Sequence, residues 1–262
     1  MKPILEVSGL SQNFGGLRAL NDVDLVIYEH EIVALIGPNG AGKTTFFNCI
    51  TGIYTPTEGD VFLNNEHKGR LRLNGRKAHE VTALGMARTF QNIRLFPEMT
   101  VLENVMIGRH CRTHAGIWGA LSRNAPSRRE EQHTIDVSYG LLESLHLASL
   151  HHEVARNLSY GAQRRLEIAR ALATEPHVLL LDEPAAGMNP QETLELQDLV
   201  RELRTQHHLS VLLIEHDMDM VMSLSDRIYV MEYGSGIAMG KPEEIRANPR
   251  VIKAYLGEDD HA

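Results

Sequence analysis

The chain has 262 residues, of which 43% are hydrophobic, 23% charged and 5% aromatic, and its formal net charge is −8 at pH 7. This composition is typical of a globular protein and excludes collagen-like, low-complexity and disordered chains. The acidic balance argues against a surface that coats nucleic acid, although a local basic patch stays open. Cys49 and Cys111 are too few for a disulfide framework and indicate a reducing compartment.

The first residues show no secretory signal, because Glu6 interrupts any apolar stretch. The longest aliphatic runs, such as 32–36, fall far short of the ~20 residues that a membrane-spanning helix needs. If the protein acts at a membrane, we therefore expect other subunits to span it.

The N-terminal part of the chain is predicted to be rich in strands. Aliphatic runs at 25–27 and 32–36 flank the polar segment 29–31, which predicts a β-hairpin. The second run ends at Gly37 and a helical pattern begins at Gly42. This order predicts a strand–loop–helix unit.

A glycine-rich loop forms the middle of that unit. It fits the pattern G-x-x-x-x-G-K-[ST] with the residues Gly37, Pro38, Asn39, Gly40, Ala41, Gly42, Lys43 and Thr44. Glycines let backbone N–H groups surround phosphate oxygens, and the positive end of the following helix points at the same anion. We expect Lys43 to reach the β- and γ-phosphates and the Thr44 hydroxyl to ligate Mg²⁺.

Two later aliphatic runs, 178–181 and 211–214, lack polar alternation, as strands covered on both faces do. A helical spacing of leucines separates them, so a right-handed parallel crossover is expected. The segment 92–163 has a helical pattern instead. We therefore predict one domain over 1–262, in which a parallel-sheet core (1–91 and 164–262) carries an inserted helical subdomain (92–163).

The carboxylates Asp182 and Glu183 follow directly after the run at 178–181. Parallel sheets bind ligands beyond the carboxyl ends of their strands, so we expect this pair near the phosphate loop. Asp182 suits a direct or outer-sphere partner of Mg²⁺, and Glu183 is placed to polarise an attacking water as general base. The alternative is a solvated strand end before a turn at Pro184.

A third motif, Leu-Ser-Tyr-Gly-Ala-Gln-Arg-Arg at 158–165, precedes a predicted helix. It resembles the signature L-S-G-G-Q of ATP-binding cassette (ABC) ATPases. With the phosphate loop, the acidic pair, Gln91 and His216, the resemblance extends over nearly the whole chain in the order of a cassette. It implies an α/β fold of the P-loop NTPase class, with a RecA-like core, an N-terminal antiparallel β subdomain and an inserted helical subdomain.

The resemblance also implies a role for each matching residue. Phe14 matches the aromatic residue that stacks on adenine, and Thr45 extends the ATP-binding loop. Gln91 matches the residue that contacts Mg²⁺ and the attacking water and couples to the membrane subunit. His216 matches the switch histidine at the γ-phosphate. The implied catalytic set is therefore Glu183, His216 and Gln91, and the implied Mg²⁺ set is Thr44, Gln91 and Asp182.

The signature positions Ser159, Tyr160 and Gly161 are implied to contact the γ-phosphate held by the opposite protomer. Tyr160 replaces the first signature glycine, and Ala162 replaces the signature glutamine. Asn189 stands where many cassettes carry aspartate. These departures concern the fine geometry across a dimer rather than the class of protein.

Several segments are similar to the larger ATP-binding subunit of bacterial high-affinity branched-chain amino acid importers. They are 15–20, 87–91, 94–96, 163–170, 182–190, 214–218 and 249–257. This resemblance implies ATP and Mg²⁺ as cofactors and a second cassette as partner, either a smaller related ATPase or a second copy. It further implies two membrane permeases, an indirect link to a periplasmic binding protein, no nucleic acid, and a peripheral location on the cytoplasmic face of the inner membrane.

Two other functional classes stay open at this stage. One is a cassette of another transporter, for a different amino acid, urea or lipopolysaccharide export. The other is a non-transport cassette, although the chain lacks the long heptad insertion of chromosome-structure cassettes and carries only one signature motif.

The segment 108–129 mixes arginines with Ile117, Trp118 and Leu121. It is either a flexible insertion or a contact with permease loops or anionic lipid. His110, Cys111 and His114 lack the second pair that a four-ligand metal site requires. Cys49 is expected to be buried and inert.

Overall fold

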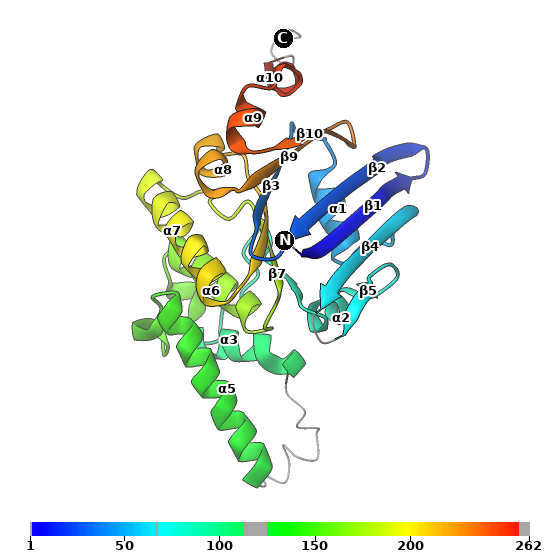
Figure 1. Ribbon diagram of the computed structural model, residues 1–262. Coiled ribbons are helices and arrows are strands. Elements are labelled where there is room, and N and C mark those ends of the chain that lie inside the picture. The colour runs from blue at the N-terminus through cyan, green and yellow to red at the C-terminus, as the bar shows by residue number, and fades with distance from the viewer. Residues whose placement is uncertain (1, 66–67, 113–124, 257–262) are drawn as a thin grey trace. The chain divides into compact units, whose positions relative to one another are not determined.

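A computed structural model describes residues 2–65, 68–112 and 125–256 of the chain. The chain forms two compact units (Figure 1). The first consists of residues 1–88 and 177–262, and the second of residues 89–176. Among the described residues, no helix combines the length and the apolar character that crossing a membrane requires.

The first unit contains a four-stranded antiparallel sheet in the order β2-β1-β4-β5. Its strands are β1 (Pro3–Phe14), β2 (Leu17–Tyr28), β4 (Glu58–Asn65) and β5 (Gly69–Arg72). Alternate residues of β4 and of the second half of β2 are buried, such as Leu25, Ile27 and Leu63. This alternation is the pattern of a sheet with one face on a core.

The same unit contains a six-stranded sheet in the order β10-β9-β3-β8-β7-β6. Its strands are β3 (Ile32–Ile36), β6 (Met86–Arg88), β7 (Val178–Asp182), β8 (Ser210–Ile214), β9 (Arg227–Glu232) and β10 (Ser235–Gly240). All neighbours pair in parallel except β10, which is antiparallel to β9. Every residue of β3, β7 and β8 is buried. For β7 and β8 this was predicted from their unbroken aliphatic runs.

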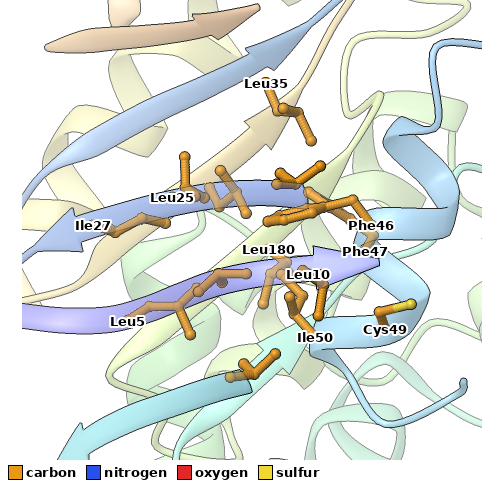
Figure 2. Packing of buried hydrophobic residues seen from close by; sticks show 14 of the residues in the cluster. Leu5, Leu10, Leu25, Ile27, Leu35, Phe46, Phe47, Cys49, Ile50 and Leu180 are labelled. Carbon is orange, nitrogen blue, oxygen red and sulfur yellow. The ribbon is translucent and has the colours of Figure 1, made fainter. Parts of the chain in front are cut away.

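Helix α1 lies in the core between the two sheets (Figure 2). Its residues Phe46 and Phe47 are fully buried and pack with Leu10 of β1 and Leu35 of β3. The helices of this unit are α1 (Lys43–Ile50), α2 (Ala78–Ala83), α7 (Pro190–Gln206), α8 (Met218–Leu224), α9 (Pro242–Arg246) and α10 (Pro249–Leu256). Because α1 is anchored by its aromatic residues, its N-terminus is fixed at the edge of the parallel sheet.

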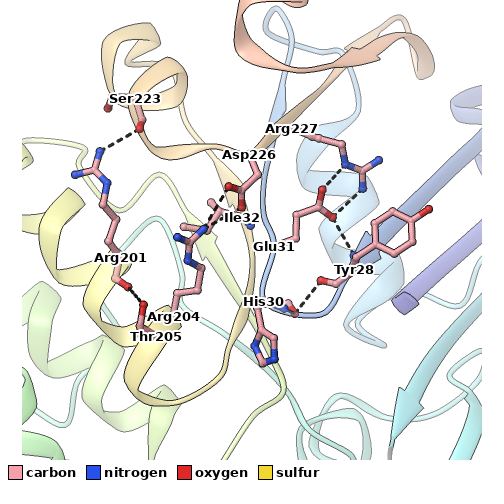
Figure 3. Close-up of polar contacts among 11 residues, drawn as sticks. Tyr28, His30, Glu31, Ile32, Arg201, Arg204, Thr205, Ser223, Asp226 and Arg227 are labelled. Carbon is pink, nitrogen blue, oxygen red and sulfur yellow. Dashed lines mark hydrogen bonds and ion pairs between the residues drawn. The ribbon is translucent and has the colours of Figure 1, made fainter. Parts of the chain in front are cut away.

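The hairpin predicted from 25–27 and 32–36 is wrong. Strand β2 pairs with β1 in the antiparallel sheet, whereas β3 pairs with β8 and β9 in the other sheet. The turn between β2 and β3 therefore joins two sheets. Glu31 in this turn is buried, accepts from the Tyr28 backbone N–H at 2.9 Å and forms an ion pair with the Arg227 guanidinium (Figure 3). The ion pair of Glu31 with Arg227, which lies 196 residues further along the chain, connects this turn to β9 of the parallel sheet.

The second unit is helical. Its described residues form α3 (Val101–Gly108), α5 (Ala125–Ser144) and α6 (Tyr160–Leu172), with 3₁₀ turns at Arg109–Arg112, Ala148–Leu150 and Ala155–Asn157. Helix α6 packs on both α3 and α5. At Gly108 a Cβ would collide with the backbone oxygen of Arg170, so α3 and α6 approach closely there.

Residues 164–176 belong to this helical unit, whereas the sequence places the subdomain boundary at 163/164. The difference has a simple cause, because α6 is one continuous helix whose apolar side packs on α3. Of the arginine-rich segment 108–129, residues 113–124 lie outside the described residues, and so do Trp118 and His114. Cys49 is buried, and this burial raises the pKa of its thiol to about 12.

Candidate nucleotide site

The phosphate loop connects the end of β3 to the start of α1. Gly37, Gly40 and Gly42 have positive φ angles of 154°, 79° and 97°. Residues other than glycine rarely adopt the φ values found at Gly40 and Gly42. A Cβ on Gly42 would also lie 2.8 Å from the backbone oxygen of Ala19, so that position excludes a side chain on steric grounds. The loop is thus built to turn its backbone inward at the N-terminus of α1.

Lys43, the first residue of α1, points its ammonium back into this loop. Its Nζ donates to the backbone oxygens of Gly37 at 2.6 Å and Pro38 at 2.9 Å, and the residue is only 7% exposed. An ammonium held among backbone groups at a helix N-terminus is an arrangement that suits an anion. Thr44 is exposed and Thr45 is half-buried, so the Thr44 hydroxyl faces solvent beside the loop.

The register of the parallel sheet brings the acidic pair to the same edge. Ile214 of β8 aligns with Leu35 of β3 on one side and with Asp182 of β7 on the other. The carboxyl ends of β3, β8 and β7 therefore lie level. The predicted proximity of the acidic pair to the phosphate loop follows from this alignment.

Asp182 has a partner that sequence analysis did not identify. Arg88 at the end of β6 donates from Nη2 to Asp182 Oδ2 at 2.6 Å and from Nη1 to Asn48 Oδ1 on α1 at 2.7 Å. Both ion-paired side chains are 7% exposed. Arg88 thus links the β7 carboxylate to the helix that carries the phosphate loop. No spacing in the sequence connects Arg88 with Asp182, which lies 94 residues further along the chain.

The side chains of Glu183, directly after β7, and His216, shortly after β8, are in contact. His216 Nε2 lies 2.8 Å from Glu183 Oε1. Glu183 itself has φ 47°, and its backbone N–H donates to the Ile214 oxygen at 2.9 Å. A left-handed backbone is unusual for glutamate and is typical of residues whose side chain must point in a set direction.

Glu215, which precedes the histidine, is a second residue that sequence analysis did not assign. It is 5% exposed, and its carboxylate accepts from the backbone N–H groups of Ala185 at 2.8 Å and His216 at 3.0 Å. Burial raises the pKa of Glu215, although these hydrogen bonds act in the opposite direction. Glu215 thereby ties the segment after Glu183 to the segment that carries His216.

Phe14 ends β1 and is 42% exposed. Its ring meets that of Tyr54, which follows α1, edge to face at a centroid distance of 5.3 Å. Tyr54 is 37% exposed. The exposed face of an aromatic ring in such a pair can stack on a ring system such as a purine.

The remaining predicted site residues belong to the helical unit. Ser159 caps α6, where its hydroxyl accepts from the Ala162 backbone N–H at 3.3 Å. Ser159 and Tyr160 are exposed, whereas Gly161 is buried. Gln91 has an exposed side chain, and its backbone oxygen accepts from the Arg164 guanidinium at 2.8 Å. The structure therefore separates the predicted residues into a group at the sheet edge and a group in the helical unit.

Comparison with known proteins decides the family. A family model described as "ABC transporter" matches residues 20–186, and one described as "Branched-chain amino acid ATP-binding cassette transporter" matches residues 237–261. The high-affinity branched-chain amino acid transport ATP-binding protein LivG of Escherichia coli K12 is 50% identical over 98% of this chain and 99% of its own length. The chain belongs to the ABC transporter family. The predicted family, the α/β cassette fold and the class of transport ATPase are thereby confirmed.

Other proteins agree with this assignment. BraF of Pseudomonas aeruginosa, named as a branched-chain amino acid transport ATP-binding protein, is 49% identical over 98% of this chain and 99% of its own length. The ADP conformation of the cassette MJ1267 has a TM-score of 0.84 and 32% identity, covering 98% of this chain and all of its own. A dimeric structure of the cassette MJ0796, bound to ADP and phosphate, has a TM-score of 0.74 and 25% identity, covering 91% and 99%.

Proposed function

We propose that this chain is the ATP-hydrolysing subunit of an importer for the branched-chain amino acids leucine, isoleucine and valine. The observation that carries the proposal is the 50% identity to LivG of E. coli over 98% of the chain. The match of residues 237–261 to the branched-chain amino acid cassette model supports the same cargo. Because the cassette does not touch the cargo, the assignment of the substrate rests on similarity.

The sheet-edge residues fit MgATP. The glycine loop and the Lys43 ammonium offer donors to phosphate oxygens, and the Phe14–Tyr54 pair offers a surface for the adenine. Oxygen donors such as the Thr44 hydroxyl and the Asp182 carboxylate, with Gln91, are the ligands that Mg²⁺ prefers. Mg²⁺, when bound, neutralises charge on the phosphates.

Glu183 is the proposed general base. Its carboxylate is oriented by His216 Nε2 at 2.8 Å and by a backbone that turns into the left-handed region. A carboxylate held in this way accepts a proton from water, and the adjacent imidazole N–H donates to the same oxygen or to a phosphate. We assign His216 the role of reporting the γ-phosphate and Asp182 the role of holding the metal.

Gln91, Ser159, Tyr160 and Gly161 complete the proposal on the helical unit. The signature residues are proposed to face the nucleotide held by a second cassette, and Gln91 to couple to a permease. The partners are a second cassette, two permeases and, indirectly, a periplasmic binding protein. The proposed location is the cytoplasmic face of the inner membrane.

The test is uptake of labelled leucine, isoleucine and valine by cells that lack the gene. Deletion is expected to abolish high-affinity uptake of at least one of the three, and a wild-type copy to restore it. A Glu183→Gln copy is expected to fail, because turnover falls by ~10²-fold or more without the general base. The variant should still bind MgATP, as measured by calorimetry.

Two outcomes would count against the proposal in different ways. Unaffected uptake of all three amino acids, with loss of another solute or of outer-membrane assembly, would contradict the cargo. Near-normal ATPase activity of the Glu183→Gln variant in the assembled complex would contradict the assigned base.

A further inference from the structure

A buried ion pair in the helical unit lies between two of the proposed site segments. Arg164 and Glu167 are one helical turn apart on α6, and their side chains are 0% and 1% exposed. Arg164 Nη1 lies 2.9 Å from Glu167 Oε2. Arg164 is the largest fully buried side chain among the described residues.

The pair does more than neutralise its own charges, because it binds the backbone around Gln91. Arg164 donates to the backbone oxygens of Phe90 at 2.6 Å and of Gln91 at 2.8 Å. Glu167 Oε1 accepts from the backbone N–H groups of Phe90 at 3.4 Å and Arg94 at 3.2 Å. One pair of side chains on α6 therefore binds both N–H groups and carbonyl oxygens of the backbone in segment 90–94.

The same arginine also contacts the signature motif. Its Nη2 donates to the Tyr160 hydroxyl at 3.3 Å, and its guanidinium lies 5.9 Å from the centre of that ring. Tyr160 stands where the signature normally has glycine, which could not make this contact. Ser159, the N-cap of α6, precedes it directly.

We propose that Arg164 and Glu167 are positioning residues that make the Gln91 segment and the signature end of α6 move as one body. Nη1 and Nη2 of Arg164 are both hydrogen-bonded, whereas its Nε is buried without a partner among the described residues. A buried network of this kind resists displacement, because a displaced member would leave a buried charge without its partner. A displacement of Gln91 by nucleotide or permease is then transmitted to Ser159 through α6. This inference rests on the proposed roles of Gln91 and Ser159.

The test replaces the pair by apolar residues of similar size, as Arg164→Met/Glu167→Leu. Replacing a buried ion pair in this way is often neutral for stability, so the double variant is expected to fold. If it does not, the single change Arg164→Lys keeps a positive charge beside Glu167 and removes the forked contact with the backbone oxygens of Phe90 and Gln91. The matched control is Arg156→Met, which removes an exposed ion pair with Glu98 in the same unit.

The first readout is hydrogen exchange of the backbone amides in the isolated chain. Exchange at Phe90 and Arg94 is expected to rise about tenfold or more in the double variant and to stay unchanged in the control. The second readout is the number of amino acid molecules transported per ATP hydrolysed, measured in the complex with its own permeases. This ratio is expected to fall roughly 2- to 30-fold, while MgATP affinity of the isolated chain is retained.

An unchanged transport ratio in a folded double variant, despite faster exchange at 90–94, would overturn the coupling role. Unchanged exchange would overturn the clamp itself. Failure of the proposed function is distinguishable, because in that case the wild-type complex would not hydrolyse ATP in response to the cargo.

Discussion

At the edge of the parallel sheet, the buried carboxylate of Asp182 depends on Arg88 to compensate its charge. Their ion pair is 2.6 Å long, and each side chain is 7% exposed. Asn48 and the ring of Phe47, both on α1, also contact Arg88. Asp182 therefore reaches its position near the phosphate loop already paired with a cation.

We expect Arg88→Met to lower the free energy of unfolding by about 3–5 kcal/mol, because Asp182 is left as a buried charge without its partner. Urea denaturation of the isolated chain measures the effect. Arg72→Met, which removes an exposed ion pair with Asp60, is the control and is expected to cost less than about 1 kcal/mol. A loss from Arg88→Met as small as that of the control would show that the pair is not needed to hold Asp182.

Sequence reasoning named the residues that we propose to carry the chemistry, but not those that hold them in place. Lys43, Asp182 and Glu183 stand in short motifs whose meaning follows from strand ends and helix starts. Arg88 and Arg164 act through partners 94 and 73 residues away, and no spacing in the chain encodes such contacts. From the sequence alone, neither arginine can be distinguished from one on the surface, because only the structure shows that its side chain is buried.

At the scale of elements, Asn189 begins the longest helix of the sheet unit, α7. Its Oδ1 accepts from the Glu192 backbone N–H at 3.0 Å, and the Glu192 carboxylate accepts from the Asn189 N–H at the same distance. This reciprocal cap is followed by Pro190 at the first helical position. An aspartate at this position would offer the same acceptor to the helix N-terminus.

Asn189→Ala is expected to lower the free energy of unfolding by about 1 kcal/mol, the usual effect of losing an N-cap acceptor. Asn189→Asp keeps the acceptor and adds a charge that suits the positive helix end, so it should be neutral or slightly stabilising. Thermal unfolding of the three proteins side by side measures both effects. Equal losses in the two variants would mean that the cap does not stabilise α7.

The elements themselves were predicted with uneven success, for a physical reason. The fully buried strands β7 and β8 were identified because strands covered on both faces must be continuously apolar. The pairing of β2 was wrong because proximity in sequence favours a hairpin, whereas the buried Glu31–Arg227 ion pair directs β3 to the other sheet. Periodicity identifies a strand, but only tertiary contacts select its neighbour.

At the scale of the whole molecule, the decisive fact is that the chain carries one phosphate loop, at 37–44, and one signature motif, at 158–161. If a nucleotide site needs both motifs from different protomers, two sites require two cassettes. In a symmetric dimer of this chain, each contact would then occur twice across one axis. The dimeric structure of MJ0796 supports association as a property of similar cassettes.

Complementation between two inactive variants tests this arrangement. Lys43→Ala removes the cation at the phosphates, and Ser159→Arg places a bulky charge at the signature end of α6, so each homodimer should be inactive. In a mixed dimer, the intact loop of one protomer meets the intact signature of the other at one of the two sites. An equal mixture should then recover about a quarter of the wild-type sites, because half of the dimers are mixed and one of the two sites in each mixed dimer is complete.

Steady-state ATPase activity measures the recovery. Differently tagged copies prove that mixed dimers form, and a mixture of two Lys43→Ala preparations is the control. If mixed dimers form and activity stays at the level of that control, either the site is built within one chain or the natural partner is a different cassette. In the second case, adding that cassette must restore activity to each variant on its own, because each variant still supplies one intact motif to one of the two sites.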